Sequence, residues 1–174
     1  MLSEKTQTEA AGEPDTLFAG LEPAAGLALA VSGGPDSMAL LALFAQWRRG
    51  TGDTRPAVVL TVDHGLRPES AEECAYVAEV ARHFGLEPRV LRWRPAAGTA
   101  ISQTSARDGR FRLIFQAMRR LDLSHLLLAH HRDDQAETVV MRFLNGSGID
   151  GMAGMARMSD RGGVTLVRPL LAYS

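Results

Sequence analysis

The sequence predicts an α/β protein whose doubly wound, mostly parallel, five-stranded sheet carries helices on both faces. Short continuous apolar runs recur along the chain, as in strands that are buried on both sides. Each run except the last is followed by a stretch with helical apolar spacing, so strands and helices alternate. Three of the runs end directly in polar clusters, which the carboxyl ends of parallel strands would bring to one edge.

The first strand is expected at Leu27–Val31 and is followed by a Ser-Gly-Gly-Pro turn. A helix over Asp36–Arg49 follows from the spacing of its apolar residues, and Gly50 ends it. The run Ala57–Val62 (AVVLTV) then predicts a second, fully buried strand.

The middle of the chain predicts a helix over Ala71–Phe84, which Ser70 precedes and Gly85 stops. A third strand is expected at Pro88–Trp93, followed by a loop and a long helix over Ser102–Leu121.

The fourth strand is expected at Ser124–Ala129 (SHLLLA) and leads into a helix over Gln135–Leu144. Residues 145–163 are rich in Gly and Met, which predicts mostly loop with a short helix. Val164–Val167 completes the five strands.

Composition bounds the class of protein. The 174 residues are 45% hydrophobic and 22% charged, and no run is long enough to span a bilayer. The N-terminus lacks a signal-peptide pattern, and the single cysteine, Cys74, excludes an internal disulfide. A cytoplasmic location without membrane association is therefore expected.

Residues 1–22 are expected to form a disordered or weakly ordered tail, in which 16–21 add one helical turn. The remaining 23–174 are expected to form one nucleotide-binding domain. Outside the tail, 18 arginines stand against 15 acidic residues, a net charge of +3. This excess permits nucleic-acid binding without demonstrating it.

The turn Ser32–Ser37 has the features of an anion site at a helix N-terminus, where backbone N–H groups are free. Neither GxxxxGK[ST] nor GxGxxG is present in this turn. The alternative is a glycine turn that joins strand to helix and binds nothing. Asp36 favours a ligand, because a carboxylate beside phosphates requires a cation such as Mg²⁺.

The cluster His130–Glu137 follows the fourth strand and contains Asp134, which can join Asp36 on Mg²⁺. Its carboxylates can equally stabilise a helix N-terminus. Residues 63–65 can contact the adenosine of a nucleotide or simply form a turn. Arg107 and Arg110 share a helix face and can bind phosphate or face solvent.

Four blocks give the chain a specific resemblance: AVSGGPDSMALL (30–41), VDHGLRPES (62–70), SARDGRF (105–111) and the block that begins LAHHRDDQAET (128–155). They resemble the N-terminal catalytic domain of the tRNA(Ile)-lysidine synthetase family. This family belongs to the PP-loop ATP-pyrophosphatases, whose fold is adenine nucleotide alpha hydrolase-like.

The resemblance implies ATP-dependent ligation of lysine to C2 of the wobble cytidine. It implies ATP and Mg²⁺ as cofactors, and tRNA(Ile) with a CAU anticodon and free L-lysine as partners, and it leaves a homodimer open. Asp36, His130, Asp134 and Arg110 would be catalytic, with Asp36 and Asp134 holding Mg²⁺. The residues assigned to ATP are Ser32, Gly33, Gly34, Pro35, Asp36, Ser37, Val62, Asp63 and His64. Contacts to tRNA or phosphate are assigned to Arg107, Arg110, Gly146, Ser147 and Gly148.

Two positions depart from the family pattern: Asn145 replaces a frequent Arg, and Phe111 a frequent Tyr. The C-terminal tRNA-binding region of the family is expected to be absent from these 174 residues. The alternatives are a tRNA 2-thiolation enzyme, which a lone Cys74 disfavours, and a non-catalytic ATP-binding module.

Overall fold

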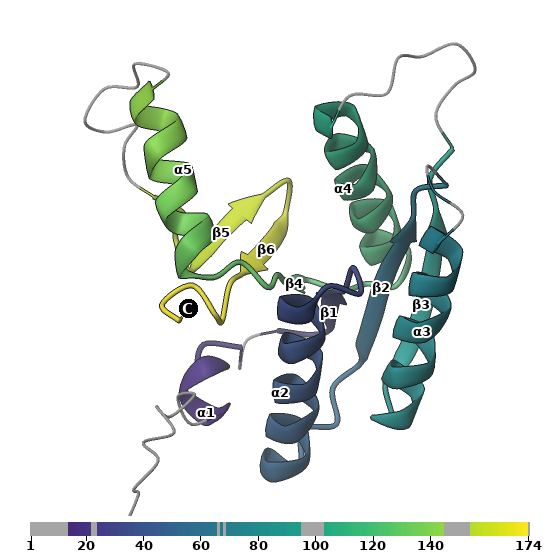
Figure 1. Cartoon of the computed structure of the whole chain (residues 1–174). Helices are drawn as coiled ribbons and strands as arrows, with labels where there is room; N and C mark the ends of the chain where they lie inside the picture. The colour runs from purple at the N-terminus through teal and green to yellow at the C-terminus, as the bar shows by residue number, and fades with distance from the viewer. Residues whose placement is uncertain are drawn as a thin grey trace, which may run out of the picture.

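A six-stranded sheet forms the centre of the structure, a computed structural model that describes residues 14–21, 24–65, 67, 69–94, 103–144 and 154–173 (Figure 1). Its strands are β1 (Leu27–Ala30), β2 (Ala57–Asp63), β3 (Glu87–Arg92), β4 (His125–Leu127), β5 (Met158–Arg161) and β6 (Val164–Val167). The helices are α1 (Pro14–Leu17), α2 (Pro35–Thr51), α3 (Glu69–His83), α4 (Gln103–Arg120) and α5 (Arg132–Leu144). None of these helices is both long and apolar enough to cross a membrane.

The strand order is β3-β2-β1-β4-β6-β5, and all neighbours pair in parallel except β5 and β6. Successive β1 residues alternate between the two faces of the sheet. Leu27 and Leu29 join a core with α1, α2 and α3, whereas Ala28 joins a second core with α4. The predicted α/β class, with helices on both faces of a mostly parallel sheet, is therefore confirmed.

The sheet has one strand more than the sequence predicted. Residues 145–163 were expected to be mostly loop, yet Met158–Arg161 forms β5, antiparallel to β6. Gly162 and Gly163 connect the two strands with φ angles of 64° and 79°, the positive values that a tight hairpin turn requires. β5 is mostly exposed and its sequence, MSDR, lacks the apolar alternation by which a strand is recognised.

The segment before β1 also differs from the expected tail. Leu17, Phe18 and Leu21 are at most 2% exposed and belong to the first core. Arg157 Nη2 donates to the carbonyl oxygens of residues 16, 17 and 19 at 3.1, 2.7 and 3.2 Å, which anchors α1 to the chain before β5. Residues 1–13, 22 and 23 of the expected tail lie outside the described residues.

The strand order reverses at β1, because β2 lies on one side of it and β4 on the other. In open α/β sheets, ligands bind beyond the carboxyl ends of the strands at such a position. Ser32 follows β1 and His130 follows β4, so this topology brings two of the predicted polar clusters together.

Candidate functional site

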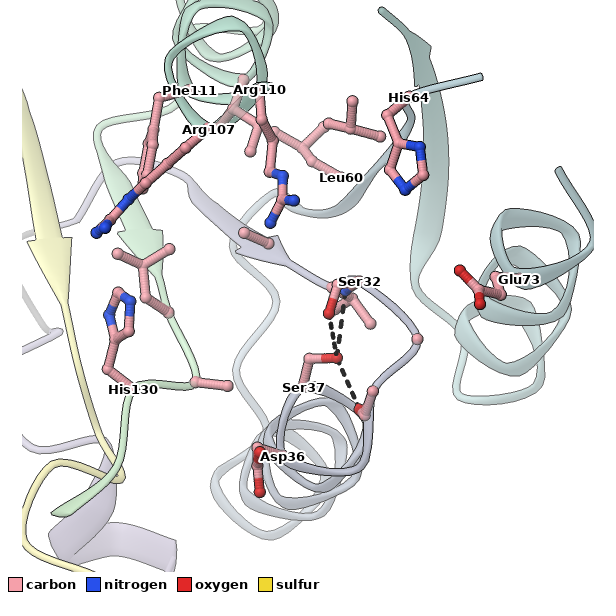
Figure 2. Close-up of a pocket in the computed structure, with 18 of the residues that line it drawn as sticks. Ser32, Asp36, Ser37, Leu60, His64, Glu73, Arg107, Arg110, Phe111 and His130 are labelled. Carbon is pink, nitrogen blue, oxygen red and sulfur yellow. Dashed lines mark hydrogen bonds between the residues drawn. The ribbon is translucent and has the colours of Figure 1, made fainter. Parts of the chain in front are cut away.

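The turn after β1 is shaped by two serines and one glycine. Ser37 Oγ donates to the Gly34 carbonyl at 2.9 Å, accepts from the Ser32 N–H at 3.2 Å and lies 3.3 Å from Ser32 Oγ (Figure 2). Gly33 has a φ of 91°, which side chains larger than glycine adopt only under strain. Gly34 has a φ of −71° and is the N-cap of α2, so within this turn only Gly33 adopts a positive φ.

The turn presents several free donors. Among the described residues, no acceptor is bonded to the backbone N–H groups of 33, 34, 36 and 37, and Pro35 at the first helical position has none to offer. These groups lie at the N-terminus of the 17-residue helix α2, whose dipole favours negative charge. The arrangement is therefore suited to phosphate oxygens.

A cleft of about 760 Å³ opens in front of this turn. Most of the predicted site residues line it: Ser32, Gly33, Gly34, Asp36, Ser37, Val62, His64, Arg107, Arg110, His130 and Asp134. Residues from the ends of β1, β2 and β4 and from helices α2, α3, α4 and α5 thus meet at one site. The cleft is large enough for a nucleotide.

Two arginines of α4 project into the cleft opposite the turn. In Figure 2, Arg110 lies above Ser32, and Arg107 extends toward His130. The two side chains share a helix face because they are three residues apart. Both guanidinium groups are therefore available to anionic groups of a ligand in the cleft.

His130 lies in the wall of the cleft, and its Nδ1 atom is buried without a hydrogen-bond partner among the described residues. Burial is the main cause that lowers the pKa of this imidazole, and the positive charge of Arg168 lowers it further. The side chain is therefore favoured in its neutral form and keeps a nitrogen available to a ligand.

Asp36 and Asp134 meet at His131, a residue to which the sequence reasoning gave no role. His131 Nε2 lies 3.5 Å from Asp36 Oδ2 and 3.7 Å from Asp134 Oδ2, so these oxygens are at most about 7 Å apart. His131 also caps α5, because its Nδ1 accepts from the Asp133 N–H at 3.2 Å and its own N–H donates to Asp134 Oδ2 at 2.9 Å. An accepting Nδ1 leaves the proton of the neutral ring on Nε2, directed at the carboxylates.

The donor set at this position suits Mg²⁺. Mg²⁺ prefers oxygen ligands and is commonly held by one or two carboxylates together with substrate phosphates. Asp36 and Asp134 supply the two carboxylates beside the phosphate-binding turn. Within the described part of the chain, no group of three or more His, Cys, Asp or Glu side chains is placed to hold a metal by itself.

Two residues assigned to ATP do not line the cleft. Pro35 begins α2. Asp63, at the end of β2, accepts from the Gly65 N–H at 3.0 Å and from Ser70 Oγ, on α3, at 2.8 Å. The Ser70 hydrogen bond is the main cause that lowers the pKa of Asp63. Cys74 is buried and also lines the cleft.

Gln135 binds the backbone of Met155, a residue that the sequence reasoning did not assign to the site. Its side-chain amide donates to the Met155 carbonyl at 2.9 Å and accepts from the Met155 N–H at 2.5 Å, which brings Met155 to the cleft wall. Glu137 and Thr138, one turn along α5, also line the cleft. The predicted phosphate contacts at Gly146, Ser147 and Gly148 lie outside the described residues.

The PP-loop domain family matches residues 5–174 of the chain. A tRNA(Ile)-lysidine synthase of Bradyrhizobium diazoefficiens is 50% identical over 161 residues, covering 92% of this chain and 45% of the relative. A tRNA(Ile)-lysidine synthase of the Wolbachia symbiont of Brugia malayi is 41% identical over 149 residues, covering 85% and 34%. The chain thus spans less than half the length of these curated relatives.

Two solved structures share the fold at low sequence identity. The U34-tRNA thiolase NcsA from Methanococcus maripaludis superposes with a TM-score of 0.66 at 16% identity, over 83% of this chain and 52% of the thiolase. The FMN adenylyltransferase of Candida glabrata gives a TM-score of 0.54 at 13% identity, over 92% and 51%. These likenesses support the architecture alone.

Proposed function

Since this chain belongs to the PP-loop family of ATP-binding domains, we propose that it is the ATP-dependent catalytic domain of a tRNA(Ile)-lysidine synthase. It would join lysine to C2 of the wobble cytidine of a tRNA(Ile) with a CAU anticodon. The observation that carries the proposal is the cleft itself, in which free backbone N–H groups, two arginines and two carboxylates converge. Relatives of that name cover nearly the whole chain at about half identity.

The first step is an adenylation. The C2 carbonyl oxygen of the cytidine attacks the α-phosphorus of ATP, and the bond to the bridging oxygen breaks, so that pyrophosphate leaves. The N–H groups at 33, 34, 36 and 37 would bind the leaving pyrophosphate and stabilise its growing charge. Arg110, which projects above this turn, would stabilise the α-phosphate in the transition state.

In the second step the amine of free lysine attacks C2, and the C2–oxygen bond breaks to release AMP. The amine loses a proton to form the neutral lysidine linkage. His130, favoured as a neutral imidazole, would hydrogen-bond the reacting cytidine or its phosphate.

Asp36 and Asp134 would hold Mg²⁺ between the turn and the start of α5. When bound, the ion would supply positive charge against the pyrophosphate oxygens. A cytoplasmic location remains the expectation, because ATP and tRNA are both available there, and a homodimer stays open.

The proposal is tested by ATP–pyrophosphate exchange with and without a CAU-anticodon tRNA(Ile) transcript. Exchange that requires the tRNA supports adenylation of the RNA. ATP binding without any exchange, in this chain and in a chain extended to the length of its relatives, would favour a non-catalytic ATP-binding module instead.

The second candidate is tRNA 2-thiolation, the reaction class named for one protein of the same fold. Cys74 is the one cysteine in the sequence, and burial raises the pKa of its thiol. Mass spectrometry of nucleosides from the product tRNA separates the two reactions. A lysine adduct on cytidine supports ligation, whereas sulfur incorporation overturns it.

A further inference from the structure

A group of three side chains lies beside the cleft, where α4 meets β5. The guanidinium of Arg161, on β5, is 5.2 Å from the ring centroid of Phe111 and 5.9 Å from that of Phe115. The two rings are 5.8 Å apart and inclined at 41°. We call this group the Arg161 platform.

The platform continues a wall of the cleft. Phe111 lines the cleft together with Arg107 and Arg110, whereas Phe115 and Arg161 are not among the lining residues. Phe111 and Phe115 are one helical turn apart, so they share a face of α4. The guanidinium of Arg161 lies over the ring of Phe111, so the platform begins at the cleft wall and extends along α4 to Phe115.

The guanidinium is exposed and available. No carboxylate of the described residues lies within 4 Å of it, and it makes no hydrogen bond to them. Stacking over aromatic rings fixes the plane of a guanidinium while leaving its N–H groups free for a bidentate phosphate contact. α4 adds to the positive field, because it carries five arginines and one aspartate.

We propose that the Arg161 platform binds a phosphodiester of the RNA strand that flanks the nucleotide held in the cleft. The inference rests on the proposed function, since it requires an RNA substrate. Arg161 would donate two hydrogen bonds to one phosphate, and Phe111 and Phe115 would hold the guanidinium in that orientation.

The experiment measures binding of a fluorescently labelled CAU anticodon stem-loop RNA to the 174-residue chain at several salt concentrations. Arg161→Ala is expected to raise the Kd for RNA about five- to tenfold and to reduce the salt slope by about 0.7, as for one lost phosphate contact. The Kd for ATP and the melting temperature should not change. Arg49→Ala, in the last turn of α2, is the matched control that also removes one exposed arginine.

Two further variants separate the charge of Arg161 from its orientation. Arg161→Lys keeps the charge but loses the planar fork, so it should recover the salt slope and only part of the affinity. Phe115→Leu should weaken RNA binding less than Arg161→Ala. The double variant Arg161→Ala/Phe115→Leu should bind RNA as strongly as Arg161→Ala alone, because the ring of Phe115 acts only by orienting the guanidinium.

The inference and the proposed function can fail separately. If tRNA-dependent pyrophosphate exchange is present but Arg161→Ala binds RNA as Arg49→Ala does, the platform is not an RNA site. If Arg161→Ala weakens the binding of ATP rather than that of RNA, the guanidinium contacts the nucleotide and the inference is wrong. If neither the 174-residue chain nor a chain extended to the length of its relatives binds RNA or catalyses exchange, both proposals fall.

Discussion

At the level of single residues, the carboxylates of Asp36 and Asp134 converge on one imidazole nitrogen at the cleft. Both aspartates and the turn at Ser32–Ser37 could be identified as candidate site residues from the sequence, because each belongs to a short motif whose chemistry can be recognised. It gave no role to His131, whose contact with Asp36 joins segments 95 residues apart in sequence. A contact between residues so far apart in sequence depends on tertiary structure and leaves no local signal.

Asp36→Asn is expected to lower Mg²⁺-dependent ATP turnover in the pyrophosphate exchange assay by about 100-fold, and Asp134→Asn should do the same. An amide has the shape of the carboxylate but lacks its charge. Asp133→Asn, which removes an exposed charge from the same helical turn, should retain most of the activity. Exchange at the wild-type rate in either of the first two variants would reject these aspartates as the metal site.

Gly109→Ala should destabilise the chain by about 1–3 kcal/mol through overpacking. A Cβ at this position would lie 2.3 Å from Trp93 Nε1 and 2.7 Å from its Cε2, so either the indole or α4, which carries Arg107 and Arg110, would have to shift. The melting temperature and the rate of pyrophosphate exchange should therefore both fall.

The double variant Gly109→Ala/Trp93→Leu provides the control, because the shorter side chain makes room for the added methyl group. Its loss of stability should be smaller than the sum of the two single losses. Purely additive losses would show that the indole does not limit this position.

His125 makes stability depend on pH. Burial is the main cause that lowers its pKa, and the charge of Arg55 lowers it further, so the folded state binds its proton less readily than the unfolded state does. Stability from this residue is complete above the unfolded-state pKa of about 6.5 and is lost as the pH falls toward the folded-state value.

The melting temperature of His125→Asn should therefore fall less between pH 7.5 and pH 5 than that of the wild type, although the depressed pKa of His130 leaves part of the dependence. Identical slopes in calorimetric scans would assign the acid sensitivity to other groups.

At the level of elements, the helices and parallel strands were predictable from sequence, and the exposed strand was not. Apolar runs such as Ala57–Val62 leave few alternatives to a buried strand, whereas β5 has no apolar pattern and is recognised only by its pairing with β6. The start of α5 was placed at Gln135 rather than Arg132, because the cap is His131 instead of a usual Ser, Thr, Asp or Asn.

Gly163→Ala is expected to destabilise the β5–β6 hairpin by about 1–2 kcal/mol, because the φ of 79° is strained for any residue with a Cβ. Chemical unfolding with urea would measure the change. Gly50→Ala, in the last turn of α2 with no atom within 4 Å of the new methyl group, should instead stabilise by up to about 1 kcal/mol. Equal effects of both substitutions would mean that the turn geometry does not matter.

At the level of the whole molecule, the sheet separates two cores, and the segment before β1 belongs to the first of them. Phe18 is 1% exposed and packs against Phe44 and Trp47, with ring centroids 5.5 and 5.2 Å away. The sequence did not predict this, because Leu17, Phe18 and Leu21 form too short an apolar pattern in a polar segment. Their partners lie on α2, which only tertiary structure identifies.

Phe18→Ala should cost about 3–5 kcal/mol in the free energy of unfolding, as expected for emptying a core position of an aromatic ring. Asp15→Ala, an exposed change in the same segment, should cost less than about 0.5 kcal/mol. Denaturant titrations of both variants test whether this segment is part of the domain. A neutral Phe18→Ala would show that it contributes nothing to the fold.

The pairing of β1 with β4 also determines at which stage of folding the cleft forms. Leu27 lies beside His125 in this pair, so the two walls of the cleft come from segments about 98 residues apart. Closing so long a loop is slow and entropically costly, whereas the β1–β2 half can form from a much shorter stretch. During translation, the β1–β2 half of the sheet would therefore leave the ribosome and fold first. The cleft would be complete only after β4 has been synthesised and has paired with β1.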